Sequence, residues 1–289
     1  MNLFGLGISR RSLAIAAALV GTVSLAIGAH AALNTKRALD SAKAVAAGQM
    51  DSAIAGRPSR LALVIGNGHY PDANSPLTQP INDARALTGA LRHEGFNVDV
   101  IEDASHDDMV RAIARLKAKV RADSVVMLFF GGYGIQVGRE SYMIPVDAAI
   151  WKEADVRRDG VSVEAVLDAV KAFGACAKLV VLDASRRNPY ERRFRTFSHG
   201  LAPITAPDNA LILTSASPGA VAEDSTGTDS VLVTELLNHI NDKADRPRAA
   251  ETIFNQTRVA ISRASDGAQV PSVSSSLMED VSFNAKAGN

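Results

Sequence analysis

Cysteine is almost absent from this sequence. The single cysteine, Cys176, excludes an intrachain disulfide, and no group of cysteines and histidines has the spacing of a zinc site. Cys176 lies between two alanines at the start of an apolar run, so we expect a small buried residue and not a reactive thiol. We predict no metal site and no cofactor.

An excess of charge of either sign is also missing. Lys and Arg together number 31, as do Asp and Glu, and the formal net charge is zero. A general polyanion binder normally carries a basic excess, so nucleic acid is disfavoured as a partner. Hydrophobic residues make up 47% of the chain, enough to build a full core. The composition therefore favours a folded chain over a disordered one.

Charged residues are missing from one long stretch near the N-terminus. The pair Arg10-Arg11 precedes residues 12–34, where His30 is the only side chain that can carry a charge. A basic pair followed by an apolar stretch is typical of export signals, and it partly resembles a twin-arginine signal. Because the arginines stay inside, we expect the remainder of the chain in the periplasm, or anchored in the inner membrane and facing the periplasm.

Two interpretations of this stretch stay open. Ala29-His30-Ala31 fits the pattern of a signal-peptidase site, so residues 1–33 would be a cleaved signal peptide. Alternatively, the segment from Leu13 to Leu33 is long enough to span a bilayer as one helix and would remain as an anchor. In both cases this segment is the only part of the chain expected to contact a membrane.

The rest of the chain divides into a linker and a folded domain. Residues 34–58 are rich in alanine and lysine, end at Gly56-Arg57-Pro58, and are predicted to be a linker. In residues 59–289, apolar runs alternate with amphipathic helices, which predicts an α/β fold with a mostly parallel sheet and helices on both faces. Strands are expected at 61–65, 96–101, 125–130, 179–182 and 210–213, a hairpin at 135–144, helices at 80–94, 105–121, 161–173, 231–241 and 249–263, and one further strand after residue 270.

Two motifs follow the third and fourth of these strands, where a parallel sheet places its functional site. They are Gly131-Gly132-Tyr133-Gly134 and Asp183-Ala184-Ser185-Arg186-Arg187-Asn188-Pro189. Both resemble caspase-like peptidases, including metacaspases and their bacterial relatives, which carry Gly-His-Gly and Asp-Ala-Cys-Arg-x-Asn-Pro there. The resemblance covers about residues 60–285 and implies the caspase-like three-layer sandwich of peptidase family C14. Further matching segments are 62–67, 82–84, 144–147, 201–203 and 215–219.

The sequence departs from this family at both catalytic positions. By motif, Tyr133 occupies the histidine position and Ser185 the cysteine position, at a separation similar to the roughly 50 residues of caspases. A serine hydroxyl is a weaker nucleophile than a thiolate, and a tyrosine with a pKa near 10 is a poor base. The resemblance with these substitutions predicts an inactive pseudopeptidase. We expect Tyr133 and Ser185 to face each other, bonded directly or through a water.

A weak endopeptidase is the alternative. Ser185 would then act with Tyr133 or His69, because His69 follows the first strand and lies at the same edge of the sheet. The simpler interpretation is that His69 is an exposed loop residue.

Asp83 and Asp183 are candidates for substrate binding. The resemblance to metacaspases implies that they line a pocket for an Arg or Lys side chain, so a basic peptide or protein is the expected partner. Alternatively, Asp83 caps a helix and Asp183 anchors a loop turn. After Ser185, arginines crowd one loop, which is either solvated or a docking strip for an acidic partner. These arginines are Arg186, Arg187, Arg192, Arg193 and Arg195.

Overall fold

The structure is a computed structural model of the 289-residue chain. It describes residue 43 and residues 59–71, 76–190, 200–222, 227–242 and 248–283. The chain divides into two compact units, Met1–Arg57 and Pro58–Asn289, and the fold below is that of the second. The predicted export segment lies outside the described residues. Among the residues that are described, no helix is both long and apolar enough to cross a membrane.

A six-stranded sheet forms the centre of the domain. Its strand order is β2-β1-β3-β7-β8-β9, with β9 antiparallel and the other strands parallel. The central strands β3 and β7 are buried along their whole length, as expected for strands covered on both faces. The strands are β1 (Arg60–Gly66), β2 (Asn97–Glu102), β3 (Val125–Gly131), β7 (Ala177–Asp183), β8 (Ala210–Thr214) and β9 (Ser272–Ser275).

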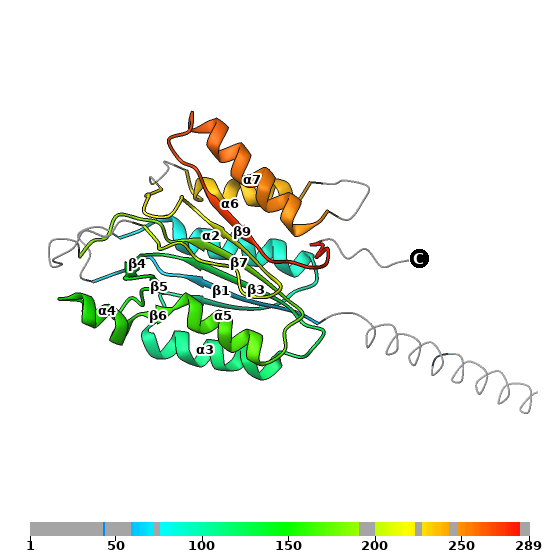
Figure 1. The fold of residues 1–289 in the computed structure, drawn as a ribbon, viewed down its shortest axis with the longest axis horizontal. Helices are drawn as coiled ribbons and strands as arrows, with labels where there is room; N and C mark the ends of the chain where they lie inside the picture. The colour runs from blue at the N-terminus through cyan, green and yellow to red at the C-terminus, as the bar shows by residue number, and fades with distance from the viewer. Residues whose placement is uncertain are drawn as a thin grey trace, which may run out of the picture. The chain divides into compact units, whose positions relative to one another are not determined.

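Helices cover both faces of this sheet (Figure 1). Along β3, Leu128 and Phe130 pack on one side and Met127 and Phe129 on the other, because successive side chains alternate between faces. The domain is therefore a three-layer α/β sandwich, which confirms the predicted fold class. One layer contains α3 (His106–Lys119) and α5 (Val163–Ala172), and the other contains α2 (Gln79–His93), α6 (Val231–Ile240) and α7 (Ala250–Ala264).

A small antiparallel sheet was only partly predicted. The expected hairpin forms from β4 (Gly134–Val137) and β5 (Glu140–Met143), but β6 (Val161–Ser162) adds a third strand. The helix predicted at 161–173 is therefore α5 preceded by β6. The helix α4 (Glu153–Asp159) was also missed. It buries only one apolar side chain, Val156, so it has no hydrophobic period to detect.

The prediction for Cys176 was wrong, because this residue is exposed. Its backbone N–H donates to the carbonyl of Ser124 at 2.9 Å, just before β7 begins. Its neighbours Ala175 and Ala177 are buried, whereas Cys176 lies in a bend before β7 begins. Cys176 lies at the amino end of β7, whereas Ser185 follows its carboxyl end, so the thiol is remote from Ser185.

Candidate functional site

The ends of three neighbouring strands define the candidate site. Gly66, Gly131 and Asp183 are in register, so β1, β3 and β7 end at one level. The loop after β3 is bonded to the loop after β7, since the N–H of Gly132 donates to the carbonyl of Asp183 at 3.2 Å. The structure thus brings the Tyr133 and Ser185 segments to one edge of the sheet, as the sequence predicted.

Tyr133 is held by a second tyrosine that sequence reasoning missed. Tyr70 accepts a hydrogen bond from the Tyr133 N–H at 3.1 Å and donates its own hydroxyl to the carbonyl of Ile144 at 3.0 Å. The two rings meet edge to face, with centroids 4.8 Å apart. A Cβ on Gly132, where φ is 154°, would lie 2.5 Å from the Tyr70 hydroxyl, so glycine is required there.

Burial raises the pKa of Tyr70, so its phenol stays protonated and remains a hydrogen-bond donor. Tyr133 is itself only 8% exposed. Both aromatic side chains therefore belong to one buried cluster beside the site. No spacing motif marks Tyr70 in the sequence, since it is simply an aromatic residue in the loop after β1.

Ser185 is fully buried inside the protein. It is 0% exposed, its N–H donates to Oγ of Ser215 at 3.3 Å, and its carbonyl accepts from the N–H of Ala222 at 2.7 Å. Its own Oγ is buried and has no hydrogen-bond partner in the part of the chain that the structure describes. The predicted direct bond between Tyr133 and Ser185 is therefore wrong. Backbone contacts, and not a contact between the two hydroxyls, place these residues.

Asp83 and Asp183 lie close enough to interact electrostatically. Asp83 is 0% exposed, and its Oδ1 accepts from the N–H of Ser230 at 2.8 Å. Burial, with the negative charge of Asp183 added to it, raises the pKa of Asp83 to about 7. Asp83 also supports a helix start, as one interpretation held, but the helix is α6, whose N-cap is Ser230, and not its own α2.

Arg186 is not a solvated loop residue. It is 5% exposed, and its Nη2 lies 3.6 Å from Oδ2 of Asp183. Burial removes water from both charged groups at a cost in free energy. The attraction between the carboxylate and the guanidinium offsets part of that cost. Arg187 is exposed, so of the two arginines of this loop that the structure describes, Arg187 fits the solvated interpretation and Arg186 does not. Arg192, Arg193 and Arg195 lie outside the described residues.

His69 is exposed, as expected, but it is not alone. Its side chain is 70% exposed, and its Nδ1 lies 2.6 Å from Oδ2 of Asp103. Oδ1 of Asp103 accepts the N–H groups of Gly68 and His69, each at 2.9 Å. Sequence reasoning missed Asp103, which follows β2 and shares no motif with His69. The arrangement orients the imidazole and leaves Nε2 available.

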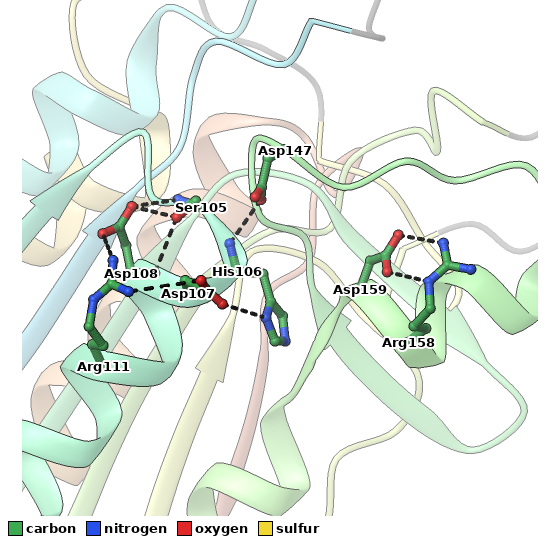
Figure 2. Close-up of polar contacts among 8 residues, drawn as sticks. All are labelled: Ser105, His106, Asp107, Asp108, Arg111, Asp147, Arg158 and Asp159. Carbon is green, nitrogen blue, oxygen red and sulfur yellow. Dashed lines mark hydrogen bonds and ion pairs between the residues drawn. The ribbon is translucent and has the colours of Figure 1, made fainter.

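The segment after β5 is anchored to the start of α3 (Figure 2). Asp147 accepts from the N–H of His106 at 2.8 Å, at the positive end of the helix. Asn67 donates to the carbonyl of Ile144 at 3.2 Å and accepts from the N–H of Ala104 at 2.8 Å. This anchoring fixes the carbonyl of Ile144, to which Tyr70 donates.

A metal site was not predicted, and the described residues contain no group of three or more His, Cys, Asp or Glu side chains that could hold a metal ion. What this edge of the sheet offers chemically is two buried carboxylates, one buried guanidinium and a sealed hydroxyl. Such a set can bind charge, and the Ser185 hydroxyl within it is buried.

Comparison with known proteins supports the family relationship. Residues 59–282 match the family model described as Caspase domain, peptidase C14. The chain is also 30% identical over 89 residues to the human mucosa-associated lymphoid tissue lymphoma translocation protein 1. That match covers 31% of this chain and 11% of the human protein. Because the family model spans most of the chain and the fold agrees with it, this protein belongs to the caspase-domain family, peptidase C14.

Proposed function

We propose that this protein is a pseudopeptidase, a caspase-domain protein that binds a ligand without cleaving it. By motif, Tyr133 and Ser185 replace the histidine and cysteine of the family. The observation that carries the proposal is the state of Ser185, whose Oγ is buried without a hydrogen-bond partner among the described residues. A serine needs a positioned base to become a nucleophile.

Tyr133 does not supply that base. Its ring packs against Tyr70 and its N–H is bonded to the Tyr70 hydroxyl, and Ser185 Oγ makes no bond to it. Loss of residues that act as one catalytic unit typically lowers the rate by about 10⁴ to 10⁶. We therefore expect peptide cleavage to be lost.

A basic peptide or protein segment is the ligand that the two carboxylates at this candidate site favour. Asp83 and Asp183 each have an Oδ2 with no hydrogen-bond partner among the described residues. Arg186, an internal cation, already lies near Asp183. An incoming Arg or Lys side chain would compete with Arg186 for the same carboxylate. Arg186 would thus lower the affinity for cationic ligands, so that only a cation placed close to Asp183 displaces it.

Weak hydrolysis by Ser185 is the second candidate. It is favoured by the contact between His69 and Asp103, because a carboxylate on Nδ1 orients an imidazole for use as a base. For this to operate, Ser185 would have to become exposed and meet Nε2 of His69. Loss of cleavage in both Ser185→Ala and His69→Gln would support this candidate.

The test uses the full-length chain and fluorescent peptides that contain one Arg or Lys, with the citrulline version of each peptide as an uncharged control. We expect binding of the Arg peptide that exceeds binding of the citrulline peptide, without cleavage. Asp183→Asn should remove the preference for Arg. Cleavage that disappears in Ser185→Ala would overturn the proposal of an inactive protein.

A further inference from the structure

Three segments of the chain meet at the amino edge of the central sheet, at the opposite end of the strands from the candidate site. The N–H of Val125, the first residue of β3, donates to the carbonyl of Ser59 at 2.8 Å. The carbonyl of Ser124, in the turn before β3, accepts the N–H of Cys176 at 2.9 Å. The start of the domain and the turns before β3 and β7 are therefore bonded together, and residues 1–58 join the domain at this edge.

The helices α3 and α5 lie side by side on one face of the sheet (Figure 1), and both end at this edge because each is followed by a strand that starts there. A Cβ on Gly174 would lie 3.8 Å from the Cα of Ala122, so the turns that follow the two helices are in contact. We call five side chains of these helix ends and turns the amino-edge surface: Lys117, Lys119, Arg121, Lys171 and Phe173.

A large aromatic side chain of this surface is exposed beside its cations. Phe173 is 51% exposed, and Nζ of Lys117 lies 5.3 Å from the centroid of its ring. A single exposed apolar side chain is common on protein surfaces and by itself indicates little. A ring next to long cationic side chains, however, is the combination that suits a membrane surface, where the ring enters the lipid and the cations stay at the headgroups.

Most of the cations of the amino-edge surface are not neutralised by an acidic side chain. Lys171 is the exception, because its Nζ lies 2.6 Å from Oδ2 of Asp208. The other three cations form no ion pair within the part of the chain that the structure describes. Asp123 is the only acidic residue in the segments 117–124 and 171–174. The surface therefore attracts an anionic partner.

We propose that the amino-edge surface docks on a membrane that contains anionic phospholipids. The ring of Phe173 enters the interface, and Lys117, Lys119 and Arg121 bind lipid phosphate groups. This docking does not depend on whether the candidate site binds a ligand. It would direct the carboxyl edge of the sheet, and the candidate site with it, away from the bilayer.

The place where the chain enters the domain favours lipid over an acidic protein as the partner. Residues 12–34 contain no Asp, Glu, Lys or Arg, and this part of the chain joins the domain at Ser59, on the same edge as the amino-edge surface. If residues 12–34 enter a bilayer, the amino edge is the part of the domain that the chain leads to from it. The sequence predicts a membrane contact for residues 1–33 alone, so the amino-edge surface would add a second one.

The experiment uses the full-length chain with an environment-sensitive dye on Cys176, the only cysteine, which is exposed and close in sequence to Phe173. The labelled chain is mixed with vesicles of phosphatidylcholine alone, or of phosphatidylcholine with phosphatidylglycerol. We expect a blue shift of the dye emission only with phosphatidylglycerol, and its loss as sodium chloride is added, because salt screens the attraction. In phosphatidylcholine vesicles, insertion of residues 12–34 would tether the chain without shifting the emission, so tethering and docking are distinguished.

Variants of the surface test its residues. Lys119→Gln together with Arg121→Gln should raise the amount of phosphatidylglycerol vesicles needed for half of the blue shift about thirtyfold, and Phe173→Ser should raise it as well. Arg139→Gln together with Arg263→Gln is the matched control, because it removes the same charge from exposed positions elsewhere and should change nothing.

Three results would overturn the proposal. One is a blue shift of equal size with both kinds of vesicle, and another is a shift that the double substitution at Lys119 and Arg121 leaves unchanged. The third is a shift caused by soluble polyglutamate but not by phosphatidylglycerol vesicles, since the partner of this surface would then be an acidic protein.

Discussion

The guanidinium of Arg186 lies 3.6 Å from Oδ2 of Asp183, and both side chains are buried. The residue directly after Ser185 therefore turns into the protein, where its charge balances that of the buried Asp183 carboxylate.

The first prediction concerns this pair. Arg186→Ala should lower the free energy of unfolding by about 3 kcal/mol, because a buried carboxylate loses its partner. Ethylguanidinium at millimolar concentration should restore part of the loss by binding at Asp183, and urea unfolding measures both effects. Arg187→Ala is the control, since Arg187 is exposed. Equal effects of the two substitutions on the free energy of unfolding would show that the contact between Arg186 and Asp183 does not stabilise the fold.

The second prediction is a pH dependence that arises from Asp83. Its pKa of about 7 in the folded state lies above the ordinary value of 3.8, so the folded protein keeps this proton where the unfolded chain has lost it. The contribution of this proton to the free energy of unfolding is fully present below about pH 4 and is lost as the pH rises through 7. Asp83→Asn mimics the protonated carboxyl and should therefore be more stable than wild type at pH 8, by about 1 to 3 kcal/mol.

Chemical unfolding of Asp83→Asn at pH 4, 6 and 8 measures this difference, which should shrink to near zero at pH 4. The matched control is Asp107→Asn, because the Asp107 side chain is 80% exposed. A difference from wild type that stays constant across this range would contradict the assigned protonation.

The third prediction tests whether the candidate site can still support catalysis and bind a basic peptide. Tyr133→His together with Ser185→Cys should produce slow cleavage after Arg or Lys, and each single substitution should do much less, because the two residues act as a unit. Tyr70 now packs against Tyr133, so the histidine needs the same support. A double variant that folds but neither cleaves nor binds basic peptides would show that the candidate site does not bind such peptides. Peptide cleavage followed by mass spectrometry supplies the readout.

The fourth prediction concerns location. We propose that residues 1–33 direct export, as a cleaved signal or as an anchor. An alkaline phosphatase fused after residue 58 should be active outside the cytoplasm, and changing Arg10 and Arg11 to Gln should reduce that activity. The size of the fusion on a gel distinguishes cleavage from anchoring. A stable but inactive fusion would refute export.

The fifth prediction concerns the thiol. Because Cys176 is exposed, a maleimide should label it in the folded protein within minutes. Labelling should leave the proposed peptide binding at the Ser185 site unchanged, since Cys176 and Ser185 lie at opposite ends of β7. Slow labelling, or loss of binding in Cys176→Ala with the fold intact, would contradict the structure described above.

The sequence alone determined the fold class and the meeting of two motifs. Apolar runs that alternate with amphipathic helices specify a parallel sheet, and parallel strands end at a common edge. The common edge placed Tyr133 and Ser185 on the same side of the sheet, and the resemblance to caspase-like peptidases paired them and named Asp83 and Asp183. The short elements α4 and β6 were not predicted, because so few residues show no periodic spacing of apolar side chains.

Only the tertiary structure decided what these residues contact. Arg186 reads as one more charge in a basic loop, yet it is buried because Asp183 lies within reach. Cys176 was interpreted as a buried residue among alanines, yet it is exposed in the bend that precedes β7. The bond from Tyr133 to Tyr70 joins residues from different strand ends. The local pattern of apolar and polar residues specifies which helices and strands form. Whether a polar group is buried, and which group it pairs with, depends on residues distant in the sequence that only folding brings together.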